Sequence, residues 1–362
     1  MKKSFILSGV ALAFLSSCSS MNDNQSNSTR NENGHESAVL QSSNEARIEV
    51  IASHLEAPWA INKLEDTFYI TERTGKIAKI KNGEVTRQNV LLTKTLSTAS
   101  EAGLLGLVLA PDFEQSNQAF AYYTYEKGRE QFNRIVLLQL VEDTWHEKVV
   151  LVDEIPSGTY HHGGRLKIGP DRKLYATAGD ASNPDFAQDV DSLGGKILRI
   201  NLDGTIPEDN PFPSSYVYSY GHRNPQGIGW AQDGSLYASE HGQSANDEIN
   251  KIYAGENYGW PIIEGIETQE GLITPLFTSG ENITWAPSGM DFYKDELFVA
   301  ALRGEALLAF HLKTEEVREI VADVGRTRDV WIEQGVLYWI TNNTDGRGTP
   351  SSKDDQLFQM KL

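Results

Sequence analysis

The sequence predicts an all-β fold, specifically a six-bladed β-propeller. One alternating hydrophobic segment that runs into polar residues recurs six times, at residues 68–73, 119–124, 174–180, 236–240, 297–300 and 337–341. Asp- and Gly-containing turns precede most copies, which is the chemistry that hairpins need. Amphipathic helices of useful length are scarce. Six similar units of a few strands each favour a propeller, because its radial repetition hides the edges of the sheets.

The N-terminus has the layout of a secretory signal. Lys2 and Lys3 precede an apolar run at residues 5–15 that is too short to span a bilayer. Small residues then lead directly into Cys18, the only cysteine of the chain, and this pattern resembles the lipobox of bacterial lipoproteins. We therefore predict that residues 1–17 are a removed signal peptide and that Cys18 is lipidated. The protein would then be anchored in the bacterial cell envelope, facing the periplasm or the surface; an incidental cysteine is the alternative.

Two further segments complete the predicted organisation. Residues 18–45 are rich in Ser, Asn, Gln and charge, a composition that buries too little apolar surface to fold, so they are expected to form a flexible tether. Residues 46–362 are long for one domain, but propellers often reach that length as a single unit. The formal net charge of -18 repels phosphate backbones and argues against a nucleic-acid partner.

Further strands are predicted next to the repeated segments and at the two ends of the propeller region. Further strands come directly after two of the repeated segments, at residues 75–80 and 195–200. We expect residues 47–53 to close the ring of the propeller by pairing with the last strands, near residues 356–362.

Polar loops recur where these strands end. Tyr-His-His-Gly-Gly-Arg occupies residues 160–165, and Gly-Asp follows the next strand at 179–180. Gly-His-Arg-Asn-Pro (221–225) and Ser-Glu-His-Gly (239–242) repeat the arrangement. Because loops on a rigid scaffold carry function, these segments predict one site assembled from several repeats, and an enzyme.

Many blocks of the sequence, in order and spacing, resemble those of the soluble quinoprotein glucose and aldose sugar dehydrogenases, which use pyrroloquinoline quinone (PQQ). The resemblance covers nearly the whole chain after the tether. It rests on Ala-Pro-Trp (57–59), Thr-Glu-Arg (71–73), Glu-Ala-Gly-Leu-Leu-Gly (101–106), His-His-Gly-Gly-Arg-Leu (161–166), Gly-His-Arg-Asn-Pro-Gln-Gly (221–227), Asp-Glu-Ile-Asn (247–250) and Asn-Tyr-Gly-Trp-Pro (257–261), among others.

This resemblance implies the oxidation of an aldose at C1 to a lactone, with hydride transfer to PQQ. Removing the hydroxyl proton requires a base with a pKa near neutral, and His161 takes the family's base position. Asp180 matches the carboxylate that orients this histidine, and Arg223 matches the cation beside the quinone oxygens, where negative charge grows. His162 is the competing base, but the spacing to the Gly-Arg pair of the family selects His161.

The same resemblance implies the rest of the cofactor site. Asn224 would hold PQQ by hydrogen bonds, and Arg326 and Arg328 match an Arg-x-Arg pair that meets its carboxylates. Alternate residues of a strand share a face, so both guanidinium groups could converge on one anion. Glu101 and Thr284 are further expected contacts. Relatives of the glucose type have a lysine where Leu302 falls, and Arg303 is the candidate replacement.

Calcium is the second implied cofactor. It accepts a flexible shell of oxygen ligands, so it could bridge PQQ to protein carbonyls. Gly242 and Gln243 match two such backbone ligands beside the cofactor. Glu248 and Tyr258, the latter through its main-chain oxygen, match a second, structural calcium site.

Two other function classes stay open at this point. A calcium-dependent propeller hydrolase of lactones or phosphoesters needs several Asp, Asn and Glu side chains in the central channel, and the Arg-rich set argues against it. A non-catalytic ligand-binding propeller is compatible with the fold, since propellers host unrelated functions. The sequence specifies neither the sugar nor the electron acceptor.

Overall fold

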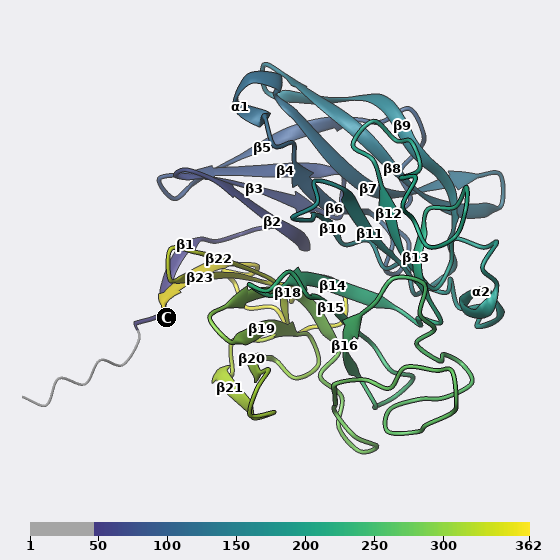
Figure 1. Cartoon of the computed structure of the whole chain (residues 1–362). Coiled ribbons are helices and arrows are strands. Elements are labelled where there is room, and N and C mark those ends of the chain that lie inside the picture. Colours follow the sequence, from purple (N-terminus) through teal and green to yellow (C-terminus); the bar gives the residue numbers. More distant parts are fainter. Residues whose placement is uncertain (1–46) are drawn as a thin grey trace, which may run out of the picture. The chain divides into compact units, whose positions relative to one another are not determined.

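Residues 47–362, the part of the chain that this computed structural model describes, form five β-sheets (Figure 1). One sheet has eight strands and the other four have four strands each. The predicted signal peptide (1–17), the lipidation of Cys18 and the tether (18–45) lie outside the described residues. Between residues 47 and 362, no helix has the length and apolar character needed to cross a bilayer.

The eight-stranded sheet contains the first two blades. Each is a four-stranded antiparallel meander. The parallel pairing of β5 with β9, from Asn89–Thr144 to Leu91–His146, joins their outer edges. The strands are β2 (Pro58–Leu64), β3 (Thr67–Glu72), β4 (Lys76–Lys81) and β5 (Glu84–Leu91), then β6 (Leu104–Leu109), β7 (Gln118–Lys127), β8 (Glu130–Val141) and β9 (Thr144–Pro156). A one-turn helix, α1 (Phe113–Ser116), connects β6 to β7.

Blades three to five are separate sheets in which consecutive strands are neighbours. The third contains β10 (Leu166–Ile168), β11 (Leu174–Ala178), β12 (Lys196–Ile200) and β13 (Val217–Tyr220), with the short helix α2 (Asp185–Gln188) between β11 and β12. The fourth contains β14 (Pro225–Trp230), β15 (Leu236–Glu240), β16 (Glu248–Ile252) and β17 (Phe277–Thr278). The fifth contains β18 (Pro287–Tyr293), β19 (Glu296–Ala301), β20 (Ala306–His311) and β21 (Val317–Val321).

The sixth blade combines the two ends of the described chain. It contains β22 (Thr327–Glu333), β23 (Val336–Thr341), β24 (Leu357–Lys361) and, from the N-terminal side, β1 (Glu49–Ala52). β1 pairs antiparallel with β24, with Glu49 opposite Gln359, which confirms the predicted closure. The first strands of the blades also contact one another in a closed cycle, in the order β2, β6, β10, β14, β18 and β22. The fold is therefore a six-bladed β-propeller, as predicted.

The repeated hydrophobic segment of the sequence is the second strand of every blade: β3, β7, β11, β15, β19 and β23. Every residue of β11 and of β15 is buried. Burial on both faces follows from the architecture, because each blade packs against a neighbour on either side. The repeat was visible in the sequence because these strands contribute most continuously to the core.

Antiparallel pairing brings the polar loops to one end of the ring. A residue that precedes the first strand of a blade lies beside a residue that follows the second strand. His161 and His162 precede β10 and Asp180 follows β11, while Arg223 precedes β14 and His241 follows β15.

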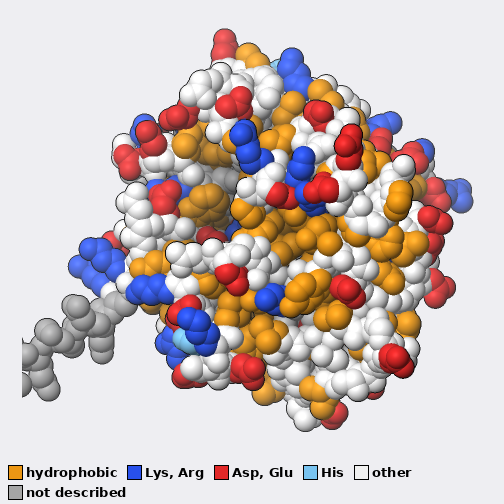
Figure 2. All heavy atoms as spheres, in the orientation of Figure 1, with side chains coloured by type: hydrophobic (Ala, Val, Ile, Leu, Met, Phe, Trp, Pro, Cys, Tyr) orange, Lys and Arg blue, Asp and Glu red, His pale blue; other side chains and the backbone are white. Residues whose placement is uncertain are grey.

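The space-filling view shows hydrophobic side chains gathered around the middle of one face, where the surface is hollowed and Lys or Arg side chains lie beside it (Figure 2).

Candidate active site

A cavity of about 370 Å³ lies where these polar loops meet. Its walls come from several blades, since they include residues before β10, β14 and β18 and residues after β15 and β19. Nearly all of the lining is polar or charged: Glu101, Tyr160, His161, Arg223, Asn224, His241, Gly242, Gln243, Ser244, Asp247, Thr284, Ala286, Arg303 and Arg347. Eight of the predicted site residues thus lie around one cavity.

His161 and Asp180 form a hydrogen-bonded pair at this cavity. Nδ1 of His161 lies 2.7 Å from Oδ1 of Asp180, whose side chain is buried. Trp260 Nε1 donates to the other carboxylate oxygen at 2.9 Å, and the Ser182 N–H donates to Oδ1 at 2.8 Å. The backbone of His161 is left-handed, with φ of 65°. With Nδ1 bound to the carboxylate, the neutral ring keeps its lone pair on Nε2.

Gly179 makes the close approach of these two loops possible. A side-chain Cβ at this position would lie 2.1 Å from the carbonyl oxygen of His161 and 2.9 Å from Oδ1 of Asn224. Any other residue would therefore push the loop before β10 away from the strand end that bears Asp180.

His162 points elsewhere, although it is adjacent in sequence. Its side chain is 1% exposed, and its Nδ1 lies 3.1 Å from Ser157 Oγ and 3.3 Å from Asn133 Oδ1. Burial lowers the pKa of His162 to about 4. The imidazole is held neutral inside the protein, and it lines a smaller inner cavity rather than the one beside His161.

Arg223 and Asn224 present polar atoms that no protein group satisfies. Arg223 Nη1 donates to the carbonyl of His241 at 3.2 Å, and its guanidinium carbon lies 5.2 Å from the Trp260 ring centroid, but its buried Nε has no partner. Asn224 accepts a hydrogen bond from the Gly163 N–H through Oδ1, whereas its buried Nδ2 has none. Unpaired buried donors are costly and mark places where a ligand is expected.

Arg326 and Arg328 converge on one carboxylate, that of Asp345. Arg326 Nη2 lies 3.1 Å and Arg328 Nη2 lies 3.8 Å from Asp345 Oδ2. Arg328 also donates to Gln226 Oε1 at 2.8 Å, and burial lowers the pKa of Arg328 to about 9. The Nε atoms of both arginines are buried without a partner.

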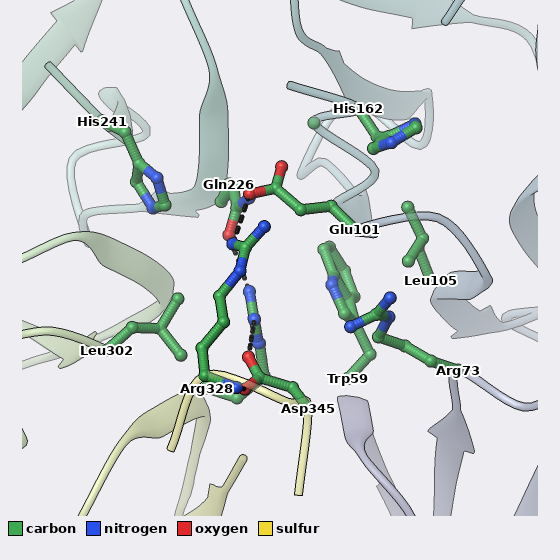
Figure 3. A pocket seen from close by; sticks show the side chains of 12 residues that line it. Trp59, Arg73, Glu101, Leu105, His162, Gln226, His241, Leu302, Arg328 and Asp345 are labelled. Carbon is green, nitrogen blue, oxygen red and sulfur yellow. Dashed lines mark hydrogen bonds and ion pairs between the residues drawn. The ribbon is translucent and has the colours of Figure 1, made fainter. Parts of the chain in front are cut away.

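Arg328 and Asp345 line the inner cavity that His162 also lines. Figure 3 shows this cavity enclosed by ribbons from many parts of the chain, with Leu302 and His162 on opposite sides of the view. Leu302, at the position of the lysine in relatives of the glucose type, is buried in this wall. Neither Arg326 nor Arg328 lines the larger cavity beside His161.

Thr284 and Arg303 line the larger cavity in different ways. Thr284 donates its hydroxyl to Asp247 Oδ2 at 2.9 Å. The same oxygen accepts the N–H groups of Trp285 and Ala286. Arg303 is exposed at the cavity.

The predicted calcium residues fall into two places. Gly242 and Gln243 line the larger cavity, and the Gly242 N–H is held by Asp247 Oδ1 at 3.0 Å. Glu248 lies directly opposite Glu240 in the β15–β16 ladder. Burial, together with the charge of Glu240, raises the pKa of Glu248 to about 8.

Tyr258 lies close to these two carboxylates, because its ring stacks at 4.6 Å on His222, which in turn contacts Glu240. Two acids in register, Glu240 buried and Glu248 half-buried, favour a cation between them. Among residues 47–362 there is no group of three or more His, Cys, Asp or Glu side chains able to hold a metal. The predicted calcium ligands are mainly backbone carbonyls, which such a group does not include.

Sequence reasoning missed four side chains that shape the cavity: Arg347, Trp260, His241 and Asp247. Trp260 holds Asp180, and Arg347 holds Glu101 at 2.6 Å. His241 was visible as the imidazole of the Ser-Glu-His-Gly loop, and burial lowers the pKa of His241 to about 4. Asp247 is adjacent to the predicted ligand Glu248. Arg347 carried no signal, because it lies in an irregular loop without a recognisable motif.

Comparison with known proteins places most of the chain in one family. Residues 55–349 match the Glucose / Sorbosone dehydrogenase family. Quinoprotein glucose dehydrogenase B of Acinetobacter calcoaceticus is 33% identical, over 64% of this chain and 56% of that protein. Aldose sugar dehydrogenase YliI of Escherichia coli is 30% identical over 83% of this chain and 91% of that protein.

A solved structure agrees with these matches. The PQQ-bound form of an aldose sugar dehydrogenase from Streptomyces coelicolor is 34% identical, superimposes with a TM-score of 0.81, and covers 88% of this chain and 98% of its own. The family match, residues 55–349, includes β2 to β23 and all of the predicted site residues, and it omits only β1 and β24 of the sixth blade. The protein therefore belongs to the Glucose / Sorbosone dehydrogenase family.

Proposed function

We propose that this protein is a PQQ-dependent dehydrogenase that oxidises aldoses at C1 to lactones. One observation carries the proposal: the His161–Asp180 pair faces a polar cavity whose wall also holds the unpaired donors of Arg223 and Asn224. A base, its orienting carboxylate and a cation around one cavity are the groups that this oxidation needs. The names of the Acinetobacter, Escherichia and Streptomyces relatives support the substrate class and the quinone.

The residues present fit PQQ, which carries three carboxylates and two quinone oxygens. Arg223 and Arg303 place two guanidinium groups on the cavity wall, and a third, that of Arg347, is paired with Glu101. The unpaired Arg223 Nε and Asn224 Nδ2 are donors, and the cofactor's oxygens are acceptors. Arg326 and Arg328 lie deeper and would act on the cofactor through the electrostatic field of the inner wall.

His161 would remove the proton of the sugar's C1 hydroxyl. Because Asp180 accepts the Nδ1 proton, Nε2 is the atom that takes the substrate proton, and the carboxylate stabilises the resulting imidazolium. When bound, PQQ supplies the two-electron acceptor that takes the hydride from C1. The substrate is the cyclic hemiacetal form, so loss of the hydroxyl proton and of the C1 hydride removes two electrons and two hydrogens and turns the existing ring into the lactone.

Arg223 would stabilise the negative charge that grows on the acceptor side of the cavity. Its guanidinium is already positioned by the His241 carbonyl and the Trp260 ring, so little reorganisation is needed during the reaction. Trp260 thereby connects Arg223 with Asp180, because its indole N–H holds the carboxylate while its face lies beside the cation.

Calcium is part of the proposal at both predicted places. Gly242 and Gln243 would offer backbone oxygens at the cofactor cavity, and the bonds of Asp247 fix the loop that carries them. Glu248 and the main-chain oxygen of Tyr258 would bind a second, structural ion. The facing pair of Glu240 and Glu248 supports this second site, since a cation would offset their mutual repulsion.

A reconstitution experiment tests the function. Adding PQQ and then calcium to the purified apoprotein should shift the cofactor's absorbance, and a subsequent aldose should bleach the oxidised band. Binding of PQQ without any reaction towards aldoses would leave only a ligand-binding propeller. Hydrolysis of lactones or phosphoesters in the absence of PQQ would favour the hydrolase instead.

We further propose that the enzyme is anchored in the bacterial cell envelope through a lipidated Cys18. The support is the sequence around residues 15–18 and the polar composition of residues 18–45. More than one acyl chain gives stable anchoring, whereas one gives only marginal binding. The acceptor that reoxidises the cofactor would then lie in the same compartment.

A further inference from the structure

Glu101 connects an arginine of the sixth blade to the backbone of the proposed base. Its Oε1 accepts a hydrogen bond from Arg347 Nη1 at 2.6 Å, and its Oε2 accepts the His161 N–H at 3.0 Å. We propose that Arg347 is a positioning residue, which holds His161 in its working orientation through Glu101. This inference rests on the proposed function, because it concerns the same site.

The charge of Glu101 depends on this arrangement. Burial alone would raise the pKa of Glu101, but the hydrogen bond and charge of Arg347, with the His161 N–H, lower it to about 2. The side chain of Glu101 is only 18% exposed. Without Arg347, a largely buried carboxylate would lose its counterion, and it would lower its energy by turning towards water and away from His161.

His161 needs such a restraint more than an ordinary loop residue does. Its φ of 65° is left-handed, a conformation that is unfavourable for a non-glycine residue and persists only where the surroundings impose it. The Glu101 carboxylate fixes the backbone of His161 from one side, while Asp180 fixes its ring from the other. Two separate carboxylates therefore determine where Nε2 lies in the cavity.

Arg347, whose side chain is 41% exposed, has further contacts that restrain it. Its backbone N–H donates to Asp345 Oδ1 at 2.9 Å, and Asp345 Oδ2 accepts from Arg326. The guanidinium carbon of Arg347 also lies 5.5 Å from the ring centroid of Tyr160, the residue before His161. Arg347, from the β23–β24 loop, is thus connected to the loop before β10 in two ways. It lies directly beside the ring of Tyr160, and it is linked indirectly, through Glu101, to the backbone of His161.

Amide hydrogen exchange tests the proposal in the apoprotein, without PQQ or substrate. In Arg347→Met the amides of residues 157–163 should exchange roughly five- to tenfold faster, because the His161 N–H loses a rigid acceptor. Arg347→Lys keeps the charge and should restore most of the protection. Arg318→Met removes an exposed arginine that pairs with Glu296 in the fifth blade and serves as the matched control.

A double-mutant cycle then tests whether Arg347 acts through Glu101. With the reconstituted holoenzyme, Arg347→Met should lower kcat by about 10- to 100-fold, as misplaced catalytic groups do, with little change in the KM for the aldose. Glu101→Gln keeps only one of the two hydrogen bonds and should also lower kcat. If Arg347 acts through Glu101, the kcat of the double variant should lie within about twofold of the kcat of the poorer single variant.

The outcomes separate this inference from the proposed function. Wild-type exchange at residues 157–163 in Arg347→Met would overturn the positioning role, and so would accelerated exchange spread evenly over all blades. Multiplicative losses of kcat in the double variant would show that Arg347 acts independently of Glu101, which also overturns it. If the wild type binds PQQ but oxidises no aldose, the proposed function fails, whereas the exchange measurement still decides the role of Arg347.

Discussion

His161 and Asp180 are hydrogen bonded at 2.7 Å across the boundary between a loop and a strand end, and this bond fixes which ring nitrogen faces the cavity. Trp260 donates a hydrogen bond to the other oxygen of Asp180. This bond restrains rotation of the carboxylate and therefore keeps the imidazole ring in one orientation. A histidine held in this way suits the role of base that we propose for it, with Nε2 as the atom that accepts the proton.

Replacing each of the adjacent histidines should give opposite results. His161→Ala should lower kcat by about 10² to 10⁴, with a much smaller effect on PQQ affinity, because the base acts chiefly as the proton leaves. His162→Ala should mainly lower the melting temperature, since that ring is buried among Ser157 and Asn133. Steady-state kinetics, PQQ titration and thermal melts measure the three quantities. Loss of turnover in His162→Ala alone would move the base by one residue.

The carboxylate should matter through the tautomer of the histidine. Asp180→Asn preserves the shape, but its amide can donate to Nδ1 and so leave the proton on Nε2, where the lone pair is needed. We expect kcat to fall by about 10³ to 10⁴. Asp185→Asn, at an exposed position of α2, is the matched control and should behave like the wild type. Equal activities of the two variants would contradict the assigned role of Asp180.

Acid should weaken the fold through Glu101. Its pKa is lowered to about 2 in the folded protein from an ordinary value of 4.5. A lowered pKa gives stability that is present above the unfolded value and lost as the pH falls through the folded one. The melting temperature should therefore decline between about pH 4.5 and 2, and the decline should be shallower in Arg347→Met. Parallel pH curves for the two proteins would show that Arg347 does not set this pKa.

Calcium should stabilise the protein even without PQQ. A ligand that binds only the native state raises stability by mass action, so chelation should lower the melting temperature of the apoprotein. Glu248→Gln should reduce the size of that shift, whereas Glu270→Gln, at an exposed loop position, should not. A melting temperature that is insensitive to chelator while PQQ still binds would rule out the second ion.

Membrane attachment should depend on the lipid that we propose is bound to Cys18. Cys18→Ala removes the site of acylation, so the protein should move from the membrane fraction to the soluble fraction of the cells. Fractionation followed by immunoblotting measures this, and the sugar oxidation of the released protein should be unaltered. A variant that stays with the membrane would mean that something other than the Cys18 lipid holds it.

The sequence predicted the fold well, because the propeller repeats a local pattern. The second strand of each blade is a short apolar segment with a turn before it, and both signals lie within ten residues. Ring closure by β1 and β24 could also be expected, because their segments lie at the two ends of the predicted propeller. The fusion of the first two blades through β5 and β9 could not, because a parallel pairing of outer strands leaves no periodic trace.

The site was predictable where it follows a motif and not elsewhere. His161, Asp180, Arg223 and Asn224 lie in short loops at blade junctions, so their blocks could be recognised one by one. Arg347 donates a hydrogen bond to Glu101, which is 246 positions away in the sequence, and Trp260 donates one to Asp180, which is 80 positions away. Arg347 lies in a loop without a recognisable motif and reaches Glu101 only in the closed ring. Trp260 lies in the Asn-Tyr-Gly-Trp-Pro block, but nothing in that block indicates that its partner is Asp180 of the neighbouring blade.

The pairing of β1 with β24 also has a consequence for how the protein is made. Glu49 meets Gln359, so the sixth blade is incomplete until the segment that forms β24 is available to pair with β1. Such a distant contact has a high entropic cost and forms late. The cavity takes its wall from loops on both sides of that seam, including Glu101 and Arg347. A nascent or truncated chain would thus have folded blades but no place for a cofactor, and quinone capture would follow synthesis rather than accompany it.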